Sequence, residues 1–71
     1  MVLVIRLQFG AAKSAEPWSN VPENLIETVG RGRTSGAEVA NKLEGEGWQI
    51  VSVVQVTNSG NYDQELWFRK D

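Results

Sequence analysis

The stretch SGAEVANKLEGEGWQIVSVVQV, residues 35–56, holds a helix and a strand separated by glycines. Ser35, followed three residues later by Glu38, forms a capping box, in which the two side chains satisfy amides at a helix start. A helix is therefore expected over residues 36–44. Its apolar stripe consists of Val39, Ala40 and Leu43.

Gly45 and Gly47 are expected to end this helix in a left-handed conformation. Trp48 then closes the end of the core over Leu43. Residues 48–56 are rich in Ile and Val, and apolar side chains fall on both parities. This pattern predicts a central strand that is covered on both faces.

Two further strands are expected on either side of this stretch. Residues 2–9 alternate, with Leu3, Ile5, Leu7 and Phe9 on the predicted core face. Residues 57–61 have the composition of a hairpin loop. The return strand over residues 62–69 places Tyr62, Gln64, Leu66 and Phe68 on one face and Asp63, Glu65, Trp67 and Arg69 on the other.

Residues 11–20, which follow the first strand, have no sustained period. Residues 11–20 are expected to form a loop, in which Trp18 serves as a lid on the core or as a contact anchor for a partner. Residues 21–30 fit either a short helix or an edge strand, and the sequence does not decide between them. The conformation of residues 10–33 stays open.

This order of elements predicts one small α+β domain over residues 1–71, with a mostly antiparallel sheet of three or four strands and one helix on one face, in the order β-(x)-α-β-β. The other face would carry Trp67 together with Val51 and Val53, or with Ile50 and Val54. Such a face is the kind of apolar patch that monomers avoid. A partner surface that includes Trp67, Val51, Val53 and Trp18 is therefore expected.

Composition limits the chemistry. The 71 residues include no Cys and no His, and seven Lys or Arg stand against nine Asp or Glu, for a net charge of −2. Thiol and imidazole catalysis and thiolate or imidazole metal sites are excluded. No cofactor or metal is expected, nucleic acid is an unfavoured partner, and no apolar run is long enough for a membrane span. The cytoplasm is the expected location.

The helix, the sequence Glu46-Gly47-Trp48-Gln49-Ile50-Val51-Ser52-Val53 and the last strand Leu66-Trp67-Phe68-Arg69-Lys70 resemble the small bacterial and phage family catalogued as domain of unknown function 4177. The resemblance covers residues 37–70. It implies the same succession of helix, strand, hairpin and strand. Because that family has no established activity, the resemblance implies nothing about function.

One loop has the composition of an anion site. Residues 30–36 are rich in glycine, and Arg31, Arg33, Thr34 and Ser35 could hold a phosphate group at the helix start. A solvated connector with a helix cap explains the same residues. Asp63 and Glu65, two apart on one strand face, are better explained as a charge pattern with Arg69 than as a catalytic pair.

These observations favour a non-catalytic protein-interaction module that self-associates, as a dimer, through a sheet face or an edge. Two alternatives stay open. One is a small regulatory inhibitor of phage type that binds a host macromolecular complex. The other is weak phosphate or nucleic-acid binding through Arg31 and Arg33.

Overall fold

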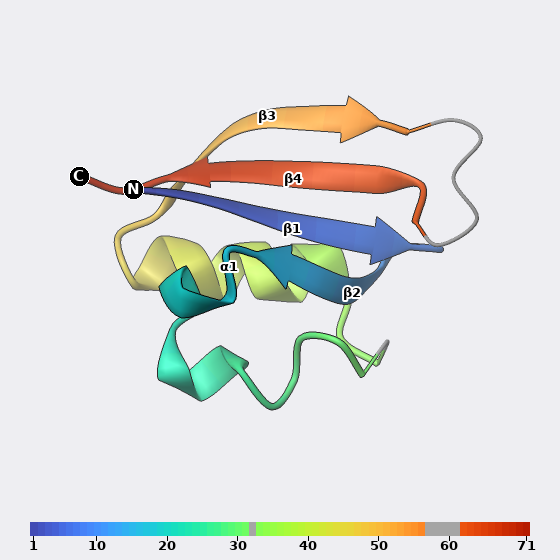
Figure 1. Ribbon diagram of the computed structural model, residues 1–71, viewed down its shortest axis with the longest axis horizontal. Helices are drawn as coiled ribbons and strands as arrows, with labels where there is room; N and C mark the ends of the chain where they lie inside the picture. Colours follow the sequence, from blue (N-terminus) through green and yellow to red (C-terminus); the bar gives the residue numbers. More distant parts are fainter. Residues whose placement is uncertain (32, 57–61) are drawn as a thin grey trace.

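Four strands form one antiparallel sheet in the order β2-β1-β4-β3 in the computed structural model, which describes residues 1–31, 33–56 and 62–71. The elements are β1 (Val2–Gln8), β2 (Ala11–Glu16), α1 (Gly36–Gly45), β3 (Gln49–Gln55) and β4 (Gln64–Arg69). Figure 1 shows α1 lying across one side of the sheet. The expected α+β fold, with a helix on one face of a small antiparallel sheet, is confirmed.

The face under α1 carries the core. Leu3 and Ile5 of β1 lie opposite Phe68 and Leu66 of β4, and all four are buried. The odd-numbered residues of the first strand therefore face the core as expected, with one exception. Phe9 lies beyond the strand in a turn with φ of 52° and is 91% exposed, because the chain reverses there to begin β2.

Residues 11–20 are not a loop. They form β2, which pairs with β1, followed by the short 3-10 helix η1 (Trp18–Asn20). β2 buries only Ala12 and Ala15, so the branched apolar side chains that signal a strand in a sequence are missing from it.

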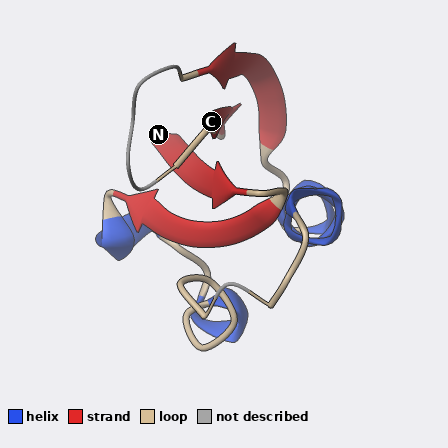
Figure 2. Cartoon of the chain, turned by 90° about the vertical axis from the view of Figure 1, so that its right-hand side faces the viewer, coloured by secondary structure: helices blue, strands red, loops and turns tan. Residues whose placement is uncertain are grey.

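The undecided residues 21–30 contain a second 3-10 helix, η2 (Glu23–Leu25), and no strand. Val21, Leu25 and Val29 from this stretch join the same core as the residues of β1 and β4. The middle of the chain therefore packs on the same face of the sheet as α1. Figure 2 shows β3 at the top, at the edge of the sheet that lies farthest from the η2 turn.

The ends of α1 follow the sequence closely. The Ser35 hydroxyl accepts a hydrogen bond from the Glu38 amide at 3.2 Å. At the other end Gly47 has φ of 94°, and the Trp48 amide donates to the Leu43 carbonyl at 3.0 Å, with Trp48 buried. Gly45 is still helical, so the left-handed stop depends on Gly47 and not on both glycines.

The predicted position of the strand over residues 48–56 is wrong. β3 is an edge strand, and all seven of its residues are exposed. The predicted hairpin loop at residues 57–61 lies outside the described residues, but β3 and β4 on either side of it pair in antiparallel fashion.

Candidate interaction surface

The largest group of exposed apolar side chains lies on β3. Ile50, Val51, Val53 and Val54, which we call the β3 strip, are 40, 57, 53 and 38% exposed. β-branched side chains of this kind favour strands because they pack against neighbours on a pleated surface. In the described part of the chain, β3 has such a neighbour on one edge only, namely β4.

The β3 strip does not divide between the two faces as the sequence suggested. Ile50 lies opposite Phe68 and Val53 lies opposite Leu66, so both are on the α1 side of the sheet. Val54 lies opposite Glu65, on the side of Trp67. Neither expected grouping, Trp67 with Val51 and Val53 or Trp67 with Ile50 and Val54, shares one face.

The cause is a register shift between Ile50 and Ser52. Val51 is the extra residue of this bulge, so the alternation of faces changes by one residue along β3. A bulge of this kind inverts every assignment beyond it that is based on parity. No feature of the sequence marks its position.

A groove runs between α1 and β3 on the core side. Its floor includes Leu7 and Leu66, and its β3 wall is formed by Ile50 and Val53. The helix wall consists of small residues, Gly36, Ala37 and Ala40. Beside these short side chains, Ile50 and Val53 remain 40 and 53% exposed.

The opposite face of the sheet is much more polar. Arg6 forms ion pairs with Glu16 at 2.8 Å and with Glu65 at 3.1 Å. The hydrogen bond with Glu16, above all, raises the pKa of Arg6 beyond its usual range; burial opposes this shift, and Glu65 adds to it. The Arg6 guanidinium also lies over the Tyr62 ring, 5.3 Å from its centroid.

Trp67 belongs to this polar face. It lies opposite Val4, which is buried, and its indole Nε1 donates to Glu65 Oε1 at 3.2 Å. Trp67 is 37% exposed. Its polar atom therefore already has a partner within the chain, and its exposed ring borders the Arg6 network.

The carboxylates of Asp63 and Glu65 bind other partners than Arg69, with which the sequence suggested a charge pattern. Glu65 pairs with Arg6 and not with Arg69. Asp63 accepts from the Phe9 amide at 3.2 Å, and its own amide donates to the Leu7 carbonyl at 2.8 Å. Asp63 therefore holds the β1–β2 turn against the start of β4. The carboxylates of Asp63 and Glu65 thus both stabilise the fold.

The proposed anion loop offers few free donors. Arg31 and Arg33 are exposed on either side of a residue outside the described set, and Thr34 is half-buried. The Ser35 hydroxyl is occupied by the helix cap, and the Gly36 amide donates to the Gly10 carbonyl at 2.8 Å. The start of α1 thus already satisfies two of its first three amides internally.

Trp18 lies away from the other predicted interface residues. It is in η1, directly after β2, at the opposite edge of the sheet from β3. Its ring is near Gly30 and remains 47% exposed. The structure therefore places Val51 and Val53 on β3 and Trp67 on the neighbouring β4. Trp18 lies beyond the opposite edge of the sheet.

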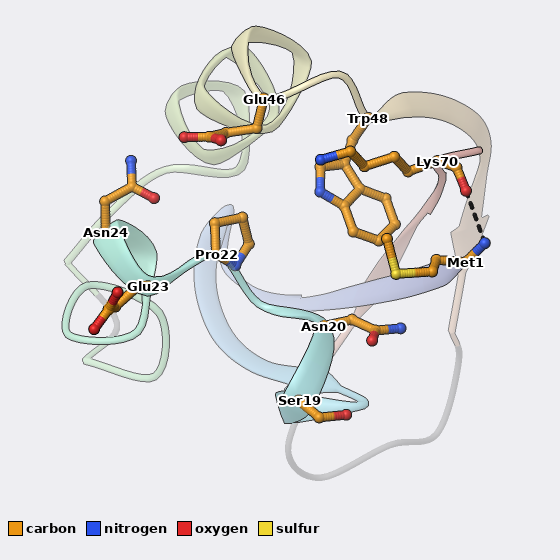
Figure 3. Close-up of a pocket in the computed structure, with 9 residues that line it drawn as sticks. All are labelled: Met1, Ser19, Asn20, Pro22, Glu23, Asn24, Glu46, Trp48 and Lys70. Carbon is orange, nitrogen blue, oxygen red and sulfur yellow. Dashed lines mark hydrogen bonds between the residues drawn. The ribbon is translucent and has the colours of Figure 1, made fainter.

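A second hollow, shown in Figure 3, lies between α1, η2 and the chain termini. Trp48 and Met1 form its apolar side, and the Met1 ammonium group donates to the Lys70 carbonyl at 2.7 Å. The Glu23 carboxylate turns away from Trp48 in this view. The hollow therefore lacks a set of polar groups converging on one point, which a ligand site needs.

Across the described residues, no group of three or more Asp or Glu side chains is placed to hold a metal ion. None of the helices in this part of the chain is long and apolar enough to cross a membrane.

The chain matches no family model, no curated protein and no solved structure. The resemblance of residues 37–70 to domain of unknown function 4177 therefore stays a prediction. The features on which a function can be argued are those of the surface itself: an uncharged apolar edge strand, a groove beside it and a polar network on the opposite face.

Proposed function

We propose that this chain is a non-catalytic protein-interaction module that self-associates as a dimer. The observation that carries the proposal is the β3 strip, four branched apolar side chains that are all more than one third exposed in a single copy. Full burial of such a side chain contributes about 1.5–3 kcal/mol. A second copy that covered the strip would recover part of this free energy for each side chain.

The size of the chain supports the same conclusion. Below roughly 70–80 residues one hydrophobic core seldom supplies more than about 3–5 kcal/mol of stability. The chain has 71 residues and no Cys, so disulfides do not add to this. Association is a common way for a small fold to gain further buried apolar surface.

The proposal is tested by sedimentation velocity and native mass measurement of the purified chain between about 1 and 100 μM, a range in which weak dimers of standard interface size populate. We expect a two-copy species that increases with concentration. A single 7.9 kDa species throughout this range would refute self-association.

A further inference from the structure

Resting on the proposed self-association, we infer that the partner surface is the free edge of β3, which pairs with β3 of a second copy in antiparallel fashion. The two sheets then join into one continuous sheet across a two-fold axis near Ser52. Pairing of this kind obtains affinity from backbone hydrogen bonds and specificity from the side chains that alternate along the strand.

The two edges of the sheet differ in a way that favours β3. At the β2 edge, the Ala12 amide donates to the Thr34 carbonyl at 2.7 Å, and Ala11 forms a bridge with Ser35. β2 also carries the charged Lys13 and Glu16. A segment of the same chain that covers an edge and charged side chains along it both protect the edge from pairing with another molecule.

β3 lacks this protection. Gln49–Gln55 contains no charge, no Pro and no Gly, and in the described residues no segment pairs with its outer edge. Its bulge at Val51 is the one protective feature, and the regular ladder resumes at Ser52. A long, uncharged apolar edge is the type that pairs with another chain.

The sequence of β3 identifies the occupant as a second copy. Gln49-Ile50-Val51-Ser52-Val53-Val54-Gln55 is chemically symmetric about Ser52, with Gln matching Gln and Ile or Val matching Val. In an antiparallel pair about this residue, two uncharged strands meet and no charge is buried. Because Val51 is the extra residue of the bulge, Val53 meets Ile50 of the other copy, both on the α1 side of the sheet, and Val54 meets Gln49 on the opposite side.

The opposite face of the sheet is a weaker candidate. The carboxylates around Arg6 are already paired, and Trp67 Nε1 has an acceptor. Packing two such faces together would remove these charged groups from water, which costs free energy unless new partners form. Edge pairing leaves this network in solvent and extends the groove of each copy toward the Ile50 and Val53 side chains of the other.

The first test places a charge beside the predicted axis. Val53→Lys places an ammonium group against the apolar β3 strip of the other copy, where it would lose water without gaining a partner, so we expect the dissociation constant of the dimer to rise about tenfold or more. Ile26→Lys, at a residue that is 47% exposed outside β3, is the matched control and should dimerise like the parent. Circular dichroism checks that both variants remain folded.

The second test uses single cysteines in a chain that has none of its own. Ser52→Cys should form a disulfide-linked dimer under mild oxidation, whereas Ser14→Cys, on β2, should not. Gln49→Cys alone should cross-link poorly, because in an antiparallel pair its two copies lie about 13 Å or more apart, from at least four residue steps at about 3.3 Å each. A mixture of Gln49→Cys and Val54→Cys should form the mixed dimer.

The outcomes separate the two proposals. A parent chain that stays monomeric refutes self-association itself. A parent that dimerises while Val53→Lys has no effect and Ser52→Cys does not cross-link refutes the β3 edge and leaves self-association standing. Efficient cross-linking of Gln49→Cys with itself refutes the antiparallel arrangement.

Discussion

At the scale of single residues, Phe9 shows how a turn can override a hydrophobic pattern. Its parity assigns it to the core with Leu3, Ile5 and Leu7, yet it is 91% exposed with φ of 52°. A left-handed backbone costs a residue with a Cβ about 1–2 kcal/mol. The hydrogen bond from the Phe9 amide to Asp63 helps to hold the residue in this conformation.

Phe9→Gly should therefore raise the free energy of unfolding by about 0.5–1 kcal/mol, since glycine adopts this φ without strain and loses little packing here. Urea unfolding followed by Trp fluorescence measures the change. Phe9→Ala is the control: it removes the same aromatic ring but keeps the Cβ, so its stability should stay within about 0.5 kcal/mol of the parent. Equal stabilisation by both variants would contradict backbone strain as the cause.

At the scale of elements, the approach of α1 to the sheet depends on Gly36. A Cβ at this position would lie 2.6 Å from Leu7 Cδ1 and 3.5 Å from Leu66 Cδ1, and both leucines are buried. The first turn of the helix therefore packs closely on β1 and β4. The same close packing forms the floor of the groove beside β3.

Gly36→Val should destabilise the fold by about 1–3 kcal/mol, because the added side chain overpacks a filled site. Gly45→Ala, at the other end of α1, is the matched control. A Cβ there meets nothing within 4 Å, so alanine should stabilise the helix by about 0.5–1 kcal/mol. Thermal and urea unfolding of both variants check the opposite signs, and a stable Gly36→Val variant would show that Leu7 can move aside.

At the scale of the whole molecule, the fold has one covered face and one polar face, and the largest group of exposed apolar side chains lies at the β3 edge. If dimerisation buries that edge, folding and association are linked, and the stability must depend on protein concentration. The exposed β3 strip then affects the stability of the protein, through its dependence on concentration, as well as its surface.

The midpoint of thermal unfolding should therefore rise by a few degrees for each tenfold increase in concentration of the parent chain. Val53→Lys should show a midpoint that is independent of concentration over the same range, because its dimer is weakened. Differential scanning calorimetry at several concentrations measures both. A concentration-independent parent would contradict coupled folding and dimerisation.

Much of this fold is encoded in local patterns. The capping box at Ser35, the left-handed Gly47 and the alternation of Leu3, Ile5 and Leu7 each follow from interactions within a few residues, so the sequence alone predicts α1, β1 and the inward-facing residues of β4. The sequence does not predict β2, because Ala12 and Ala15 carry no strand signal. Residues 57–61 lie outside the described residues, so the hairpin loop there stays a prediction.

Only the tertiary structure decided where β3 lies and which way its side chains point. An apolar run on both parities indicates that a strand will be covered on both faces, but it does not say whether the cover comes from the same chain or from another copy. The bulge at Val51, the short helix side chains at Ala37 and Ala40, and the position of β2 depend on contacts between residues far apart in sequence. Those contacts made the predicted central strand an exposed edge.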